Sequence, residues 1–345
     1  MKIAHIFAYL GDGGAEECAI LLADQAKKDG HEAVFIIDRF SELALSRLIG
    51  KYHIKPIFLR MRSSFDPFEV MLSAIGLKRI IKSEGIDILH SHMLREQSLG
   101  VIAKKMGADF KLLRTFHRFD QFNWKMRPLM AIYNKFTDAF IAISTGMADY
   151  LKSNGLVDKV SLINNGVPAV AVAKHGHALG FIGRLADEKG ILQFIDANRE
   201  MLRDTKLVVA GDGPYAVAIK RLVSDNNLNV ELLGQIDDKA DFYKKISVLV
   251  VSSKTEVMPL VVLEAYSCGL PVVGFEIDGL KTLVGNSNGK LVQYPNYEQL
   301  GKTALQVLGD SKSFANANID KYSERYSVEK MWHDTVKLYK SLTNK

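Results

Sequence analysis

Little in this sequence would support a small or unusual fold. The 345 residues include two cysteines, Cys18 and Cys268, which are too few for a disulfide framework or for a zinc site built from thiolates alone. No run approaches the roughly 20 apolar residues of a membrane-spanning helix. There is no low-complexity tract and no repeat of fixed period. These absences favour a globular protein of a reducing compartment, and we predict a cytoplasmic location.

Positive charge is concentrated in the first half of the chain. The net charge is +6, and residues 51–135 hold 16 Lys and Arg against 7 Asp and Glu. A solvated surface would explain this excess. The alternative is a face that meets an anionic acceptor or the inner face of the cytoplasmic membrane. Nucleic acid is a less suitable partner, because no stacking platform or basic helix accompanies the charge.

Short apolar runs alternate with longer amphipathic stretches along most of the chain, which is typical of parallel α/β sheets. The predicted strands are 3–9, 32–37, 54–59, 86–90, 111–115, 139–143 and 160–163, followed by 179–182, 207–210, 230–233, 248–252 and 271–275. Between them we predict helices such as 15–29, 68–83, 97–105, 190–201 and 260–267. The fold class is therefore α/β, with two doubly wound Rossmann-like domains that face a central cleft.

The domain boundaries follow from a break in this series. Residues 167–178 are rich in small residues and have no helical period, so we predict a linker between a first domain, 1–166, and a second, 179–320. Residues 321–345 contain a final helical pattern with no strand after it. In open α/β sheets, ligands bind outside the carboxyl ends of the strands, and we expect the site there.

Several strand ends carry residues suited to an anionic ligand. Gly13 and Gly14 follow the first predicted strand and open a helix, where backbone amides can approach a phosphate; Glu16 breaks the dinucleotide fingerprint. Arg184 and Lys189 lie between a strand and a helix, and two cations there can neutralise a diphosphate. Gly211 also ends a strand.

The most informative segment contains two glutamates, Glu256 and Glu264, with seven residues between them. Glu264 lies in an otherwise apolar helical stretch, where a carboxylate is costly unless it is paired or bound to hydroxyl groups. A ligand with several hydroxyl groups would satisfy it.

Together these residues resemble the retaining nucleotide-sugar glycosyltransferases of family 4, which have the two-lobed GT-B architecture. The resemblance covers nearly the whole chain. It is carried by Gly13-Gly14, Asp87 to His92, Thr115-Phe116-His117, Asn165-Gly166-Val167, Gly183-Arg184-Leu185 with Lys189-Gly190, Gly211 to Pro214, and the paired glutamates with the Ala265, Cys268-Gly269 and Pro271-Val272-Val273 that follow.

The resemblance implies a role for each matching residue. Arg184 and Lys189 would bind the donor diphosphate, Glu264 the ribose hydroxyls, and Glu256 the transferred sugar, with His117 near the 6-position of that sugar. The backbone near Pro259 and Leu260 would face donor oxygens, and that near Ile236 the base. The first domain would bind the acceptor, the second the nucleotide sugar, and the terminal helix would pack on the first domain.

One departure concerns the residues after Glu256. Family members commonly have glycine and an aromatic residue there, whereas this chain has Val257-Met258. This leaves open which sugar is transferred. The sequence also does not determine the nucleotide base of the donor, the glycosidic linkage formed or the oligomeric state of the protein.

The expected chemistry is transfer with retention of anomeric configuration by front-face substitution, without a cofactor or metal. No Asp-x-Asp motif is present, and His90 and His92 show no third metal-ligating partner in the sequence. Two alternatives remain, a nucleotide-sugar epimerase and a non-catalytic nucleotide- or carbohydrate-binding protein of the same fold. A P-loop nucleotidase is a weaker alternative, because the motif that ends in Gly301-Lys302-Thr303 requires glycine at position 296, where this chain has Asn296.

The acceptor is predicted to be a cell-surface glycan or lipid-linked molecule of the lipopolysaccharide or capsule type. The stretch from His117 to Met130 mixes basic and large apolar residues, as surfaces that contact a bilayer do. We therefore expect peripheral contact with an anionic membrane.

Overall fold

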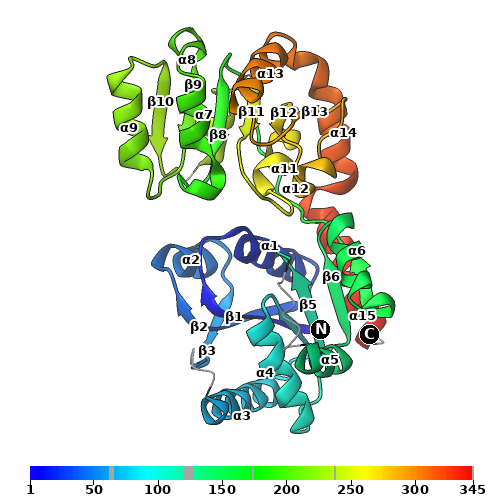
Figure 1. The fold of residues 1–345 in the computed structure, drawn as a ribbon. Coiled ribbons are helices and arrows are strands. Elements are labelled where there is room, and N and C mark those ends of the chain that lie inside the picture. The colour runs from blue at the N-terminus through cyan, green and yellow to red at the C-terminus, as the bar shows by residue number, and fades with distance from the viewer. Residues whose placement is uncertain (62–65, 120–126, 173–174, 237, 344–345) are drawn as a thin grey trace. The chain divides into compact units, whose positions relative to one another are not determined.

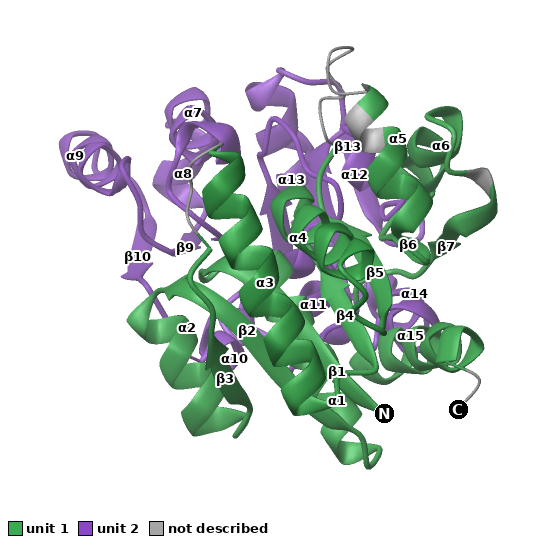
Figure 2. Cartoon of the chain, turned by 90° about the horizontal axis from the view of Figure 1, so that it is seen from below, with its two compact units in different colours: residues 1–165, 328–345 green, residues 166–327 purple. Residues whose placement is uncertain are grey.

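The computed structural model describes residues 1–61, 66–119, 127–172, 175–236 and 238–343. The chain forms two compact units, and Figure 2 colours them separately. The first comprises Met1–Asn165 with Val328–Lys345, and the second comprises Gly166–Ser327. Each unit is built on one parallel sheet with helices on both faces (Figure 1), which confirms the predicted fold class of two Rossmann-like domains.

The first unit has a seven-stranded sheet in the order β3-β2-β1-β4-β5-β6-β7. Its strands are β1 (Lys2–Leu10), β2 (Glu32–Phe40), β3 (Lys55–Phe58), β4 (Ile88–Ser91), β5 (Lys111–Phe116), β6 (Ala139–Ala142) and β7 (Val160–Leu162). Its helices are α1 (Gly14–Lys28), α2 (Glu42–Ser46), α3 (Pro67–Glu84), α4 (Leu94–Lys105), α5 (Arg127–Phe136), α6 (Thr145–Ser153) and α15 (Val328–Thr343). All strand pairs are parallel.

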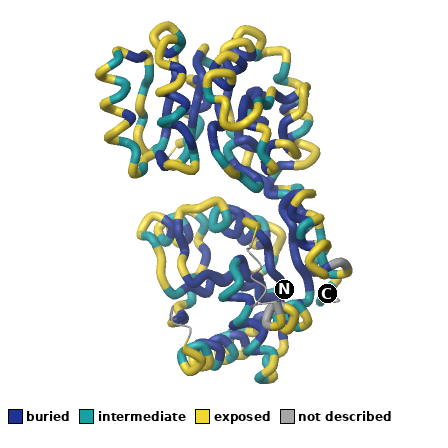
Figure 3. Tube along the Cα trace, in the orientation of Figure 1, coloured by how far each residue is buried: buried dark blue, intermediate teal, exposed yellow. Residues whose placement is uncertain are grey.

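Helices cover both faces of this sheet. One face packs against α1 and α15, in a core that includes Phe35, Leu22 and Tyr339. The other packs against α3 and α4 through residues such as Leu77 and Val101. The buried strands stand out in dark blue in Figure 3. The terminal helix α15 thus belongs to the first unit, although the chain reaches it only after completing the second.

Local sequence explains where α3 begins and ends. The side chain of Asp66 accepts a hydrogen bond from the amide of Phe68 at 2.9 Å, and Pro67 occupies the first helical position, where its missing N–H costs nothing. Gly85 ends the helix in the left-handed conformation, with φ of 64°. Among the described residues, every helix is too short or too polar to cross a membrane.

The second unit has a six-stranded sheet in the order β10-β9-β8-β11-β12-β13. Its strands are β8 (Leu179–Ile182), β9 (Leu207–Ala210), β10 (Val230–Gly234), β11 (Val248–Val251), β12 (Val272–Phe275) and β13 (Gly289–Val292). Its helices are α7 (Ile191–Ala197), α8 (Met201–Asp204), α9 (Ala216–Asp225), α10 (Lys239–Tyr243), α11 (Leu260–Ser267), α12 (Asp278–Lys281), α13 (Tyr297–Gly309) and α14 (Ala315–Arg325). One face packs against α7 and α13, while α11 and α14 pack against each other.

Two elements differ from the sequence-based prediction. The helix expected over 190–201 is divided into α7 and α8, because Asn198 ends α7 and its buried amide nitrogen donates to the carbonyls of Phe194 and Tyr297. Strand β13 was not predicted, because its four residues Gly-Lys-Leu-Val include a lysine and stand at the edge of the sheet.

The segments that join the units also differ in detail from the predicted boundaries. Val167, expected to begin a linker, is 1% exposed and forms a β-bridge with Ser327. Its carbonyl accepts a hydrogen bond from the Tyr322 hydroxyl at 2.9 Å. Residues 321–325, expected to open the terminal segment, are the last part of α14. The second unit therefore starts at Gly166 and extends to Ser327.

The anchoring of α15 gives a first prediction. Tyr339 is fully buried, and its hydroxyl lies 2.6 Å from Nδ1 of His90. Tyr339→Phe leaves that buried nitrogen without its partner and should lower the free energy of unfolding of the first unit by about 1–3 kcal/mol. Urea unfolding followed by Trp332 fluorescence, in a Trp124→Phe background, measures this. Tyr9→Phe, at a half-exposed ring, is the control, and equal stability of both variants would contradict the prediction.

Candidate active site

The strand order of each sheet reverses at one point, where ligands bind in open α/β sheets. In the second unit this switch point lies between β8 and β11, and in the first it lies between β1 and β4. Because all strands are parallel, the loops after them emerge at one edge of each sheet, its carboxyl edge. Most of the predicted site residues fall in loops or helix starts at these two edges, and Glu264 lies within α11.

At the switch point of the second sheet, the loops after β8 and β11 are joined by several contacts. Lys189 Nζ lies 2.6 Å from Glu256 Oε1, which also accepts a hydrogen bond from Ser253 Oγ at 2.8 Å. The hydroxyl of Ser252 donates to the carbonyl oxygen of Lys189 at 2.8 Å. The structure thus brings together two of the predicted catalytic residues, Lys189 and Glu256.

A second ion pair links the same loops. Lys254 Nζ lies 2.6 Å from Asp187 Oδ2, and the Lys254 amide donates to the carbonyl of Glu188 at 2.9 Å. The hydrogen bond from Lys254 lowers the pKa of Asp187. Since both side chains are partly exposed, this pair contributes little to stability.

Arg184 lies in the same loop as Lys189 but takes part in none of these contacts. Its side chain is 66% exposed, and within the described chain its ion pair is with Glu188, at 4.0 Å. The structure therefore does not bring Arg184 into contact with either predicted glutamate. Its guanidinium is open to solvent at the carboxyl edge, where an anionic ligand could reach it.

Glu264 lies inside α11 and is almost fully buried, with 3% of the residue exposed. Its two oxygens have different partners: Lys239 Nζ lies 2.5 Å from Oε1, and the Tyr243 hydroxyl donates to Oε2 at 2.8 Å. These partners offset the cost of burying the carboxylate. Lys239 comes from the start of α10, and its side chain is 35% exposed.

The remaining donor-binding candidates of the second unit also lie at its carboxyl edge. Gly211 has φ of +127°, and a Cβ there would lie 2.0 Å from the carbonyl oxygen of Gly183, so backbone packing alone requires glycine. Ile236 follows β10 and is half-buried. Pro259 is the N-cap of α11 and makes no side-chain hydrogen bond to it, and Leu260 is the first residue of that helix.

In the first unit, the glycines follow β1 and the histidine follows β5, and β4 lies between these two strands in the sheet. Gly13 is the N-cap of α1 and Gly14 its first residue; Gly13 has no side chain to cap the helix, and the Glu16 carboxylate accepts hydrogen bonds from the amides of Glu16 and Gly11. A Cβ on Gly13 would lie 2.6 Å from Oε2 of Glu16. His117 follows β5 and is half-buried, and its Nε2 lies 3.0 Å from Nδ1 of His92.

Four histidines gather around this point: His5, His90, His92 and His117. Burial lowers the pKa of His5 to about 3, and it lowers the pKa of His90 and His92 well below the ordinary value. Burial, with a smaller contribution from the positive charge of Arg114, lowers the pKa of His117 to about 4. All four imidazoles are therefore neutral near pH 7.

Three of them come close enough to suggest a metal site. The ring nitrogens of His5, His90 and His92 lie within 4.8 Å of one another, so the structure supplies the third partner that the sequence had not revealed. However, His90 uses both nitrogens in hydrogen bonds, at 2.6 Å to Tyr339 Oη and 2.7 Å to Thr115 Oγ1. Replacing these buried bonds would cost about 1–3 kcal/mol each, and we assign no metal here.

Sequence reasoning missed several residues at these edges. Lys239 and Tyr243 gave no signal, because nothing in the sequence indicates that they meet Glu264. His5 lies within an apolar strand. Glu96 is 3% exposed; its Oε1 accepts a hydrogen bond from the Ala8 amide at 2.7 Å, and its Oε2 has no hydrogen-bond partner among the described residues. Burial raises the pKa of Glu96.

The unusual residues after Glu256 are partly buried. Met258 is 7% exposed, and Val257 is half-buried. Gly279 lies against this segment, since a Cβ there would be 2.4 Å from the carbonyl oxygen of Glu256. The predicted bilayer-contact stretch lies largely outside the described residues, which omit 120–126.

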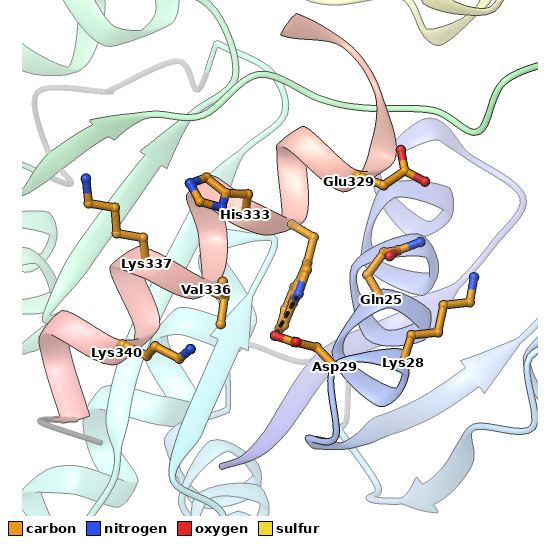
Figure 4. Close-up of a pocket in the computed structure, with 9 residues that line it drawn as sticks. Gln25, Lys28, Asp29, Glu329, His333, Val336, Lys337 and Lys340 are labelled. Atoms are coloured by element: carbon orange, nitrogen blue, oxygen red, sulfur yellow. Dashed lines mark hydrogen bonds between the residues drawn. The ribbon is translucent and has the colours of Figure 1, made fainter. Parts of the chain in front are cut away.

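A pocket of the first unit lies between α1 and α15, away from the predicted site residues (Figure 4). Its volume is about 720 Å³, and Trp332 Nε1 donates to Asp29 Oδ2 at 3.2 Å in its wall. Lys28, near the end of α1, and Lys337 also line it. Because α1 starts at the carboxyl edge and runs back along the sheet, its last turn lies toward the opposite edge. The pocket contains no predicted site residue.

Two family models match the chain. Residues 12–170 match the model described as Glycosyltransferase Family 4, and residues 176–310 match the one described as Glycosyl transferases group 1. The two matches divide the chain close to the boundary between the structural units. With the two Rossmann-like sheets, they define an enzyme of the GT-B class. The chain belongs to the GT-B glycosyltransferases, which confirms the resemblance seen in the sequence.

Individual relatives agree with this class. An uncharacterized glycosyltransferase of Methanocaldococcus jannaschii is 29% identical over 279 residues, 77% of this chain and 79% of that protein. The UDP-Gal:alpha-D-GlcNAc-diphosphoundecaprenol alpha-1,3-galactosyltransferase of Escherichia coli is 28% identical over 274 residues, 70% of this chain and 71% of that protein. The crystal structure of Anabaena HepE in complex with UDP has a TM-score of 0.83 at 19% identity, covering 99% of this chain and 100% of that one.

The buried histidines predict how stability depends on pH. Their pKa values in the folded state lie below the ordinary 6.5, so the unfolded chain binds more protons between about pH 6.5 and 4. Stability of the first unit should fall as the pH falls through this window, by at most about 1.4 kcal/mol per pH unit for each histidine. Urea midpoints at about pH 7 and pH 5 measure this. The exposed-site variant His53→Asn should keep the dependence, and an unchanged midpoint at pH 5 would contradict it.

Proposed function

We propose that this enzyme is a retaining, metal-independent glycosyltransferase. It moves a sugar from a nucleotide-diphosphate donor, most suitably a UDP-sugar, to a hydroxyl group of a lipid-linked or lipopolysaccharide-type glycan. The single observation that carries the proposal is the ion pair of Lys189 with Glu256 at the switch point of the second sheet, 2.6 Å between Nζ and Oε1. It joins a cation suited to the diphosphate to a carboxylate suited to sugar hydroxyls.

The diphosphate is assigned to the loop after β8 and the start of α11. Arg184 is available there as an exposed guanidinium and Lys189 as a half-buried ammonium. The N-cap of α11, Pro259, makes no side-chain hydrogen bond to the helix, so the amides that follow it are suited to phosphate oxygens and the helix dipole favours negative charge. Each charge-assisted hydrogen bond to the diphosphate would contribute about 1.5–3 kcal/mol.

The ribose is assigned to Glu264, with Ile236 near the base. In the free protein Lys239 occupies Oε1 of Glu264. Because the Lys239 side chain is 35% exposed, it can turn into solvent when ribose hydroxyls take its place, while Tyr243 keeps its bond to Oε2. Two similar proteins support uridine as the nucleoside of the donor. The Escherichia coli relative is named for UDP-Gal, and the Anabaena structure contains UDP.

In the transfer step, the bond between the anomeric carbon and the diphosphate oxygen breaks while the acceptor hydroxyl attacks from the same face. The departing oxygen gains negative charge and takes the proton of that hydroxyl. Arg184 and Lys189 stabilise the developing charge, as preorganised cations do in other sites. Glu256 orients the sugar, and His117, held neutral by burial, hydrogen-bonds near its 6-position.

The acceptor is assigned to the first unit. The Escherichia coli relative is named for a diphosphoundecaprenol-linked acceptor, which supports a lipid-linked acceptor here. Peripheral membrane contact is supported by exposed apolar rings, Phe58 at 59% and Phe68 at 67% exposure, in a stretch of sequence that also contains the exposed cations Lys51 and Arg60. Such a mixture of apolar and basic residues favours an anionic bilayer surface.

The proposed diphosphate site predicts the effect of removing its cations. Arg184→Ala and Lys189→Ala should each weaken UDP binding by about 1.5–3 kcal/mol, which is roughly 10- to 150-fold in Kd. Isothermal titration calorimetry measures this. The matched control is Arg199→Ala, since Arg199 pairs with Asp196 at the far end of α7. If the control and the two site variants bind UDP equally well, the assignment is wrong.

The proposed mechanism predicts the stereochemistry and metal dependence of the product. With an α-linked UDP-sugar, the new glycosidic bond should also be α, which the anomeric proton signal in NMR reports. The rate should be unchanged by EDTA, because the two cations replace a metal at the diphosphate. A β-linked product or loss of activity with EDTA would contradict this mechanism. Conversion of the donor sugar without any acceptor would instead indicate an epimerase.

A further inference from the structure

Three histidines of the first unit form a hydrogen-bonded line. Nδ1 of His5 lies 3.0 Å from Nε2 of His92, and Nδ1 of His92 lies 3.0 Å from Nε2 of His117. The line begins on β1, passes the end of β4 and reaches the residue after β5. His5 and His92 are 1% and 2% exposed, whereas His117 is half-buried. It therefore runs from the core of the unit to the carboxyl edge of its sheet.

The chemistry of imidazole makes the three rings depend on one another. A neutral imidazole has one N–H and one bare nitrogen, so a ring that accepts at one nitrogen donates from the other. If His117 donates from Nε2, then His92 accepts at Nδ1 and donates from Nε2 to His5. If His5 donates from Nδ1, both hydrogen bonds reverse and His117 carries its proton on Nδ1.

Every other arrangement is unfavourable. It would place two N–H groups, or two lone pairs, face to face at 3.0 Å in a buried site, where an unmade hydrogen bond is costly. The three residues must therefore share one tautomer, with the proton on Nε2 in all three or on Nδ1 in all three. The state of buried His5 is thereby transmitted to His117 at the sheet edge.

Packing holds the rings of the line in place. The ring of Phe7 stacks on that of His92, with centroids 4.5 Å apart and planes 9° from parallel. His90 also stacks on His92, at 4.6 Å, and His5 stacks on Phe35 at 5.3 Å. Burial keeps the rings neutral, since it lowers the pKa of His5 to about 3 and that of His117 to about 4. The orientation of His117 is thus linked to the hydrophobic core.

We propose that His92 and His5 are positioning residues for His117. They fix the plane of its ring and determine whether its Nδ1 meets the substrate as a hydrogen-bond donor or as an acceptor. This inference rests on the function proposed above for His117. A partner whose direction and proton are set before the substrate arrives costs no reorganisation during the reaction.

The direct test is the tautomer of each ring. Long-range ¹H–¹⁵N correlation NMR on the full chain with ¹⁵N-labelled histidine distinguishes Nδ1–H from Nε2–H, and single His→Phe variants assign the signals. His5, His92 and His117 are expected to share one tautomer. His92→Phe keeps a flat ring against Phe7 but removes both hydrogen bonds, and it should leave His117 in a mixture of tautomers. A wild-type protein in which the three tautomers differ would overturn the proposal, whether or not the variant folds.

Kinetics test the functional part separately. His92→Phe should lower kcat at least about 10-fold, because a misplaced group costs rate, while the KM for the donor changes much less. Tyr339→Phe disturbs the neighbouring His90 in the same buried layer. This control variant should keep the shared tautomer, and its kcat should stay within about 2-fold of the wild-type value.

The two outcomes are distinguishable. If the wild type has one shared tautomer but His92→Phe has an unchanged kcat, the positioning role is overturned and the hydrogen-bonded line still stands. Absence of sugar transfer or UDP binding by the wild type would count against the proposed function, and the tautomer result would still stand.

Discussion

The proposed donor site of this enzyme depends on one contact, the ion pair between Lys189 and Glu256. The reversal of strand order between β8 and β11 lets the two loops that follow these strands meet at one edge of the sheet. The hydrogen bond from Ser252 to the carbonyl of Lys189 and the Lys254–Asp187 pair join the same loops. The backbone thereby fixes both the cation and the carboxylate before a ligand is present, which is what preorganised recognition of a charged substrate requires.

Both predicted glutamates have a lysine partner in the free protein. Glu256 is paired with Lys189, and buried Glu264 with Lys239 and Tyr243. An unpaired buried carboxylate would be costly, so these partners stabilise the site when it is empty. Under the proposed function the donor replaces these contacts. Its ribose hydroxyls take the place of Lys239 at Glu264, and its diphosphate binds Lys189. Hydroxyl groups suit this exchange because they can donate hydrogen bonds to a carboxylate without adding charge.

The sequence alone predicted the architecture well and the contacts poorly. Alternation of apolar runs such as Val248–Val251 with amphipathic stretches depends on local pattern, and the structure contains the predicted strands. Helix ends that depend on tertiary contacts were not predicted. Asn198 ends α7 by donating a hydrogen bond to the carbonyl of Tyr297, which lies 99 residues further along the chain. The same limit applies to the site. The spacing of Glu256 and Glu264 is visible in the sequence, but their lysine partners are not, and His5 resembles any polar residue in a strand until β1 and β4 are paired.

The role of Lys189 at the diphosphate is tested by comparing the affinities of UDP and UMP for the wild type and Lys189→Ala, by isothermal titration calorimetry. The two nucleotides differ by the phosphate that the switch-point cations are expected to bind. We expect the wild type to bind UDP at least about 10-fold more tightly than UMP, and Lys189→Ala to lose most of this difference. Equal binding of UDP and UMP by the wild type, or an undiminished preference for UDP in the variant, would contradict this role.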